Sequence, residues 1–154
     1  MILSCGNKKL KFVIQGDPNS CHPTCHAERV VKAASEAMQE QHWAKAHRDM
    51  PVELTLIAYQ ESPKSTARWK REAATHGLVP PLKQAYKWSA ITQCTMDMLS
   101  NLAYEDSNQV FKINYEARYS DEPKVEVELV GYFVSIGDVK AEVSKRNKRL
   151  VKSK

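Results

Sequence analysis

The chain has 154 residues, of which 42% are apolar and 27% are charged, and this composition fits one globular domain with a core of its own. Lysine and arginine exceed aspartate and glutamate by 5 and the isoelectric point is near 9.0, which is compatible with a polyanionic partner without requiring one. No stretch approaches the roughly 18 apolar residues of a membrane span, and the apolar part of MILSCGNKKLKF is too short for a secretory signal. We therefore expect an intracellular protein, without a membrane partner, whose four cysteines are reduced thiols.

The first part of the chain predicts a strand, a loop, a helix and a second strand. The stretch LKFVIQG at 10–16 alternates apolar and polar residues and predicts a half-buried strand. After a loop at 17–25, apolar residues recur near helical spacing over 26–50, with good helix formers between them, and Pro51 marks the break. VELTLIAY at 52–59 predicts a strand that is buried on at least one face.

The middle of the chain is the least regular part. The segment 61–87 contains four proline and glycine residues and a basic cluster, with a short helix expected at 64–75. Such a long connection usually carries a function or is mobile. Ser89 can cap the helix that follows, whose apolar stripe extends to about residue 102.

The order of the elements predicts an α/β (α+β) fold, in which two main helices pack on one mixed four-stranded sheet within a single domain at 1–137. The strands at 108–120 and 125–133 should form a hairpin around the turn DEPK. The remaining residues, 138–154, are a basic tail that begins as a helix and then frays. Its cluster at 145–149 fits a nuclear-import signal if the source is eukaryotic, and equally fits a solubilising tail.

The stretch MDMLSNLAYEDSNQVFKINYEARYSDEPKVEVELV at 96–130 combines a helix end of sequence DML, a strand start of sequence YEDSNQV and a strand VEVEL. Together with KFVIQGDP near the N-terminus, this combination resembles the RusA-type Holliday junction resolvase family. The resemblance covers about 8–131. It implies a mixed α/β domain that acts as a homodimer and cuts four-way DNA junctions symmetrically with Mg²⁺ or Mn²⁺.

The resemblance places the metal ligands of the family at positions where this chain lacks carboxylates. Counted back from Asp97 without gaps, the family motif Asp-x-Asp-Asn-x-x-Lys has its first aspartate at Lys87 and its second at Ser89. The second aspartate of the later Asp-Asp pair falls on Ser107, and Asp106 is retained. Because Mg²⁺ prefers a shell of hard oxygen ligands, we expect no catalytic residue and no cofactor. Asp97 and Asp106 are then residual acids with structural roles, and Mg²⁺ is expected only if the protein is active.

We therefore expect a catalytically inactive, resolvase-like protein that binds nucleic acid, with DNA as the first choice. An ammonium group at a former metal position can still contact a phosphate, and basic side chains of the preceding segment would extend that surface. The candidate nucleic-acid contacts are Lys87, Arg68, Lys70, Arg71 and Lys83. Trp69 and Trp88 add aromatic surfaces for stacking, although these side chains also fit a solvated face or, for Trp88, a cap on the core.

Three further functions fit the same residues. The chain can be a non-catalytic subunit of a larger complex that acts on DNA, together with a partner protein. It can be a protein-interaction or scaffold module without affinity for DNA, in which case no salt-dependent DNA binding is expected. It can also be an active Mg²⁺-dependent junction endonuclease whose acidic site is rebuilt from Glu72, Asp97, Glu105 and Asp106.

A compact group of soft metal ligands stands in SCHPTCHAER: Cys21, His22, Cys25 and His26. Zinc takes a tetrahedral set of nitrogen and sulfur ligands, usually from two separated pairs, so one compact cluster would need help from a histidine elsewhere. The simpler interpretation is a loop that leads into the helix, with Pro23 at the helix start.

Overall fold

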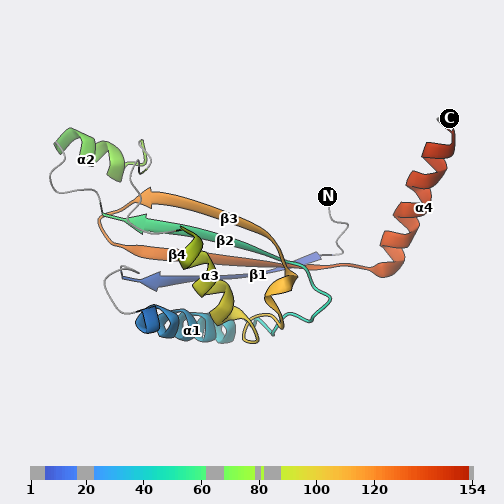
Figure 1. Ribbon diagram of the computed structural model, residues 1–154, viewed down its shortest axis with the longest axis horizontal. Coiled ribbons are helices and arrows are strands. Elements are labelled where there is room, and N and C mark those ends of the chain that lie inside the picture. The colour runs from blue at the N-terminus through green and yellow to red at the C-terminus, as the bar shows by residue number, and fades with distance from the viewer. Residues whose placement is uncertain (1–5, 17–22, 62–67, 79–80, 82–87, 153–154) are drawn as a thin grey trace.

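Four strands form one sheet, and two of the helices cover one of its faces (Figure 1). This computed structural model describes residues 6–16, 23–61, 68–78, 81 and 88–152. The strands are β1 (Gly6–Gln15), β2 (Val52–Gln60), β3 (Val110–Tyr119) and β4 (Lys124–Phe133). The helices are α1 (Pro23–Glu40), α2 (Arg68–Thr75), α3 (Trp88–Leu99) and α4 (Ile136–Lys152), with a short 3-10 helix η1 (Ser107–Gln109). The expected mixed four-stranded sheet with two packed helices is confirmed.

The strands follow the order β1-β4-β2-β3. β4 is antiparallel to both of its neighbours, whereas β2 and β3 are parallel. The strands β1, β2 and β3 therefore run in one direction and end at one edge of the sheet, which we call the C-terminal edge. The turn before β4 ties this edge together, because the N–H of Ser120 donates to the carbonyl of Gln60 (3.0 Å) and the N–H of Gly16 donates to that of Pro123 (3.0 Å).

The core lies between the sheet and the helices α1 and α3. Alternate residues of the strands point into it, as the period of two for a half-buried strand requires. Its fully buried members from the sheet and the helices include Leu10, Val52, Leu54, Leu56, Val125, Val127, Leu129, Val30, Ala34 and Leu99. The opposite face of the sheet carries the intervening polar residues, and no described helix packs on it.

The predicted hairpin between the last two strands is wrong. Among the described strands, β3 pairs with β2 alone, and β2 lies between β3 and β4. The reason lies in the composition of the strands. β2 has every second residue fully or nearly fully buried and takes a central position, whereas β3 is largely exposed and takes an edge. The short turn then passes over the end of β2 rather than folding β4 back onto β3.

The predicted helix at 26–50 is also wrong in its length. α1 ends at Glu40, and His42 adopts a left-handed conformation with φ 54°. The chain then turns so that Trp43, only 5% exposed, enters the core and its Nε1–H donates to the carbonyl of Ala103 at 3.0 Å. The tryptophan that contributed to the helical pattern thus reaches the core from a loop.

The basic tail is helical throughout its described part. α4 leads away from the sheet instead of packing on it (Figure 1). None of the described helices combines the length and the apolar character needed to cross a lipid bilayer.

Candidate nucleic-acid interface

Three of the predicted basic contacts lie together on α2. Arg68, Lys70 and Arg71 are exposed on this helix, which follows β2 and touches β3 beside the C-terminal edge. The Nε of Arg68 lies 3.2 Å from Oε1 of Glu72, which is an exposed pair of small energetic value. The ammonium of Lys70 lies 5.5 Å from the ring centre of Trp69. α2 therefore presents positive charge to solvent. Lys83 and Lys87, the other two candidates, lie outside the described residues.

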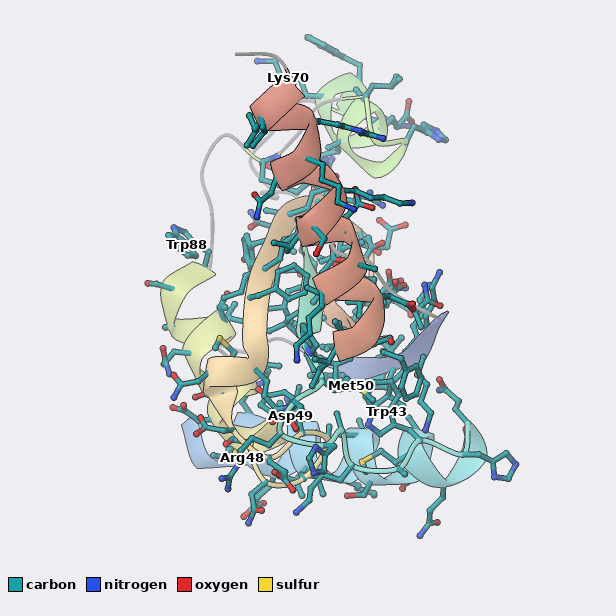
Figure 2. All side chains as sticks on the ribbon, turned by 90° about the vertical axis from the view of Figure 1, so that its right-hand side faces the viewer. Trp43, Arg48, Asp49, Met50, Lys70 and Trp88 are labelled. Atoms are coloured by element: carbon teal, nitrogen blue, oxygen red, sulfur yellow. The ribbon has the colours of Figure 1, made fainter. Side chains whose placement is uncertain are left out.

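Two exposed tryptophans flank β3. Trp69 on α2 is 66% exposed, and Trp88 at the start of α3 is 55% exposed. The ring of Trp88 lies 6.4 Å from that of Tyr115 on β3, centre to centre, at an interplanar angle of 47°. Figure 2 shows Lys70 and Trp88 from the side of α4. Trp88 is thus half-buried against Tyr115, and both tryptophans expose indole surface for stacking.

The open face of the sheet carries several charges that are paired with one another. Glu53 accepts hydrogen bonds from the hydroxyl of Tyr132 (2.6 Å) and the amide of Asn114 (2.8 Å), and the ammonium of Lys112 lies 3.5 Å away. The Tyr132 bond is the main cause that holds the pKa of Glu53 below its ordinary value. The guanidinium of Arg118 forms a bidentate ion pair with Glu116, in which Nε donates to Oε1 at 2.8 Å and Nη2 donates to Oε2 at 2.9 Å. The groups in these pairs therefore offer little uncompensated charge to a phosphate.

The two serines that the family resemblance places at metal-ligand positions lie at opposite ends of α3. Ser89 is exposed in the first turn of α3, whereas Ser107 begins η1, which lies against the other end of the helix. At a rise of 1.5 Å per residue, this helix is about 18 Å long. Within one described chain, the two positions therefore do not share one site.

Both residual acids take part in local hydrogen bonds. The carboxylate of Asp106 accepts from the N–H of Asn108 at 2.9 Å and forms a capping box at the start of η1. The exposed Asp97 accepts from the side-chain amide of Gln93 at 2.8 Å. Asp106 thus serves as the N-cap of η1, which is a structural role.

The negative charge of Asp97 also acts on nearby acids. The pKa of the Cys94 thiol is raised by burial and, to a smaller degree, by Asp97. The pKa of Tyr104 is raised by the same two causes in the same order. Cys94 therefore stays protonated at neutral pH and is a poor nucleophile.

Gln109 is a structural centre to which the sequence alone assigned no role. It is 8% exposed, and its side chain makes four hydrogen bonds to backbone. Its Nε2 donates to the carbonyls of His47 (2.7 Å) and Met50 (3.0 Å), and its Oε1 accepts from the N–H groups of Glu105 and Asp106 (both 2.9 Å). The sequence could have suggested this role, because Gln109 follows the turn residues of YEDSNQV and its amide can both donate hydrogen bonds to backbone carbonyls and accept them from backbone N–H groups.

The Cys/His cluster is described only in part. His26 lies in the first turn of α1, whereas Cys21 and His22 lie outside the described residues and the side chain of Cys25 is not described. His26 is 5% exposed, and its pKa is lowered, first by burial and then by the positive charge of Arg29. Among the described residues, no three histidine, cysteine or acidic side chains are grouped as metal ligands would be. The zinc site stays a prediction.

Two comparisons with known proteins bear on this fold. The sequence profile of the family described as endodeoxyribonuclease RusA matches residues 22–130. The chain is also 33% identical over 79 residues to the uncharacterized protein YqaN of Bacillus subtilis (strain 168); the match covers 50% of this chain and 55% of that protein. The chain thus spans only about half the length of this relative. The family match extends over most of the described core, from α1 to β4. The chain belongs to the RusA endodeoxyribonuclease family.

Proposed function

We propose that this protein binds nucleic acid, with branched DNA as the preferred form, and does not cut it by the metal-dependent route of its family. The family membership supports a resolvase-like function on DNA. The finer statement, binding without cleavage, is supported by the residues at the positions that the family uses for its metal.

The donor set at those positions does not fit a divalent cation. The family resemblance assigns the metal ligands to positions that hold Lys87, Ser89 and Ser107 in this chain. None of these three side chains is a carboxylate, and the ammonium of Lys87 adds a positive charge, so none of the three positions offers the hard, negatively charged oxygen ligands that Mg²⁺ prefers. The retained Asp106 is engaged in capping η1. The lack of carboxylates at these three positions is the observation that carries the proposal.

Binding requires only groups that this chain retains. The basic side chains of α2 would contact backbone phosphates as exposed point charges, which gives affinity without sequence preference. Trp69, on the same helix, would stack on an unpaired base such as one at a branch point. Lys87 would place an ammonium where the family has a metal, and so would hold the phosphate at that position without activating water.

We include a homodimer in the proposal. A four-way junction has two-fold symmetry, and two copies of one chain related by a two-fold axis present two equal surfaces to it. Light scattering on the purified protein at the concentration of the binding assay tests this part separately. A monomeric mass for a protein that still binds DNA in the assay would refute the homodimer.

The test is a labelled four-way junction incubated with the protein and Mg²⁺ or Mn²⁺, with the same samples on native and denaturing gels. We expect a shifted, uncut junction whose affinity falls steeply with salt. Lys87→Glu should weaken binding, whereas Lys9→Glu, the same charge reversal at an exposed position of β1, should not. Equal affinities of the two variants would refute the role of Lys87.

Two other outcomes would overturn the proposal. Cleavage that disappears in Asp97→Asn or Asp106→Asn would make the protein an endonuclease with a rebuilt acidic site. The absence of both shift and cleavage would favour a protein-interaction module, because such a protein has no DNA affinity that could depend on salt.

A further inference from the structure

The start of α1 holds two side chains whose buried polar atoms have no partner. His26 is 5% exposed, and neither of its ring nitrogens has a hydrogen-bond partner in the described part of the chain. Arg29, three residues further along α1, has a buried Nη1 that also has none among the described residues. Folded proteins seldom leave such groups unpaired, because each one costs stability. Two of them one helical turn apart indicate a position at which a ligand completes the hydrogen bonds.

Gly16 brings the end of β1 against the side chain of Arg29. It has φ 95°, and its N–H donates to the carbonyl of Pro123. A Cβ atom at Gly16 would lie 2.9 Å from Nη1 and 3.5 Å from Cζ of Arg29, so the guanidinium lies directly against the glycine backbone. Side chains of a helix lean toward its N-terminus. His26 and Arg29 therefore both lean toward the end at which the chain enters α1.

The chemistry of this place selects an anion. A guanidinium only donates hydrogen bonds, and a neutral imidazole contributes one further N–H. The first turn of α1 adds backbone N–H groups that have no partner within the helix, together with the positive end of the helix dipole, and it holds no acidic residue. The burial and the charge of Arg29 that lower the pKa of His26 keep its ring neutral. An excess of donors with one positive charge fits the oxygens of an oxyanion, whereas Arg29 would repel a metal cation.

We propose that Gly16, His26 and Arg29 form an anion-binding site that takes a phosphate group, supplied by the backbone of a nucleic acid or by a free phosphate. The nucleic-acid source rests on the proposed function. It is favoured by the place of the site, because the start of α1 and the basic helix α2 lie at the same end of the sheet (Figure 1). A strand of nucleic acid that runs along the C-terminal edge would meet both.

The first experiment uses the full-length protein, labelled with ¹⁵N, and inorganic phosphate titrated against chloride at constant ionic strength. We expect saturable shifts of the Gly16 amide and of the His26 ring nitrogens. Arg29→Gln should abolish them, whereas Lys32→Gln, at an exposed position of the same helix, should retain them. Shifts that do not saturate, or that persist in Arg29→Gln, would refute the site. If Arg29→Gln does not fold, the wild-type titration and a His26→Gln variant decide the question in the same way.

A second experiment distinguishes the two sources of phosphate. With a DNA junction, Arg29→Gln should lower the affinity by about tenfold and reduce the slope of log K against log salt by about 1, and Lys32→Gln should do neither. Equal DNA affinities of the two variants, with phosphate still saturating the site, would refute the nucleic-acid source and support free phosphate. No DNA binding by the wild type, with phosphate bound, would refute the proposed function while the site stands. A response of the His26 ring to Zn²⁺ and not to phosphate would refute the anion site itself.

Discussion

Replacing Gln109 by leucine should destabilise the fold more than any other single change at a polar side chain of the α3–β3 connection. Leucine has a similar volume but cannot make the four hydrogen bonds of the glutamine amide. Each such bond contributes about 0.5–1.5 kcal/mol, and each backbone group left unpaired in a buried place costs about 1–3 kcal/mol. The N–H groups of Glu105 and Asp106 lie near the surface and can regain water. We therefore expect the free energy of unfolding to fall by about 2–4 kcal/mol.

The measurement is equilibrium unfolding in urea, followed by the fluorescence of the tryptophans and by circular dichroism. Gln39→Leu is the matched control, because Gln39 is exposed on α1 and the same change should alter the free energy of unfolding by less than about 0.5 kcal/mol. Gln109→Glu adds a second comparison. It keeps the acceptor but turns the two donated bonds into repulsion, so it should recover part of its stability at low pH, where the neutral acid can donate again. Equal stabilities of Gln109→Leu and Gln39→Leu would refute the clamp.

Three further predictions follow from the same structure. Asp106→Ala should cost about 1 kcal/mol because η1 then has no cap, whereas Asp106→Asn should cost less, and equal destabilisation in thermal unfolding would contradict the capping role. The double variant Lys70→Glu and Arg71→Glu should reduce the slope of log K against log salt for DNA binding by about 1 for each phosphate that the variant no longer neutralises, and an unchanged slope would exclude α2 from the interface. Because the pKa of His26 is below its ordinary value near 6.5, the unfolded chain takes up a proton before the folded chain does. The free energy of unfolding should therefore fall as the pH falls below about 6.5, by at most about 1.4 kcal/mol per pH unit. This slope should be absent in His26→Asn.

The sequence predicted most strands correctly because their residues alternate, but alternation does not determine which strands are neighbours. The turn DEPK has the chemistry of a hairpin turn, yet β2 lies between the two strands that it joins. The decisive difference is the burial along β2 and the exposure along β3, which depend on the helices above them. The helix expected at 26–50 failed for a related reason. Trp43 fits a helical stripe and equally fits a loop that turns inward, and only its hydrogen bond to Ala103 distinguishes the two.

The residue types of the candidate site could be predicted from the sequence, whereas the positions of these residues relative to one another could not. Counting along the family motif predicts that the metal-ligand positions lack carboxylates, and the charge of the segment before α3 drew attention to the basic cluster of α2. Spacing alone did not place Arg29 against Gly16, because that arrangement depends on where β1 ends relative to α1.

The family motif in this chain separates into residues that hold the fold and positions that the family uses for chemistry. Gln109 and Asp106 bond to backbone within the connection between α3 and β3, and the hydroxyl of Tyr104 donates to the carbonyl of Met96 at 2.8 Å. None of these bonds involves the side chain of Ser89 or Ser107. Substitutions at the former metal positions therefore leave these hydrogen bonds of the motif intact, and replacing neighbouring carboxylates also removes their mutual repulsion. Under the proposed function, a family member can in this way lose its metal ligands at little cost in stability, while the scaffold and the basic helix α2 remain for the proposed binding.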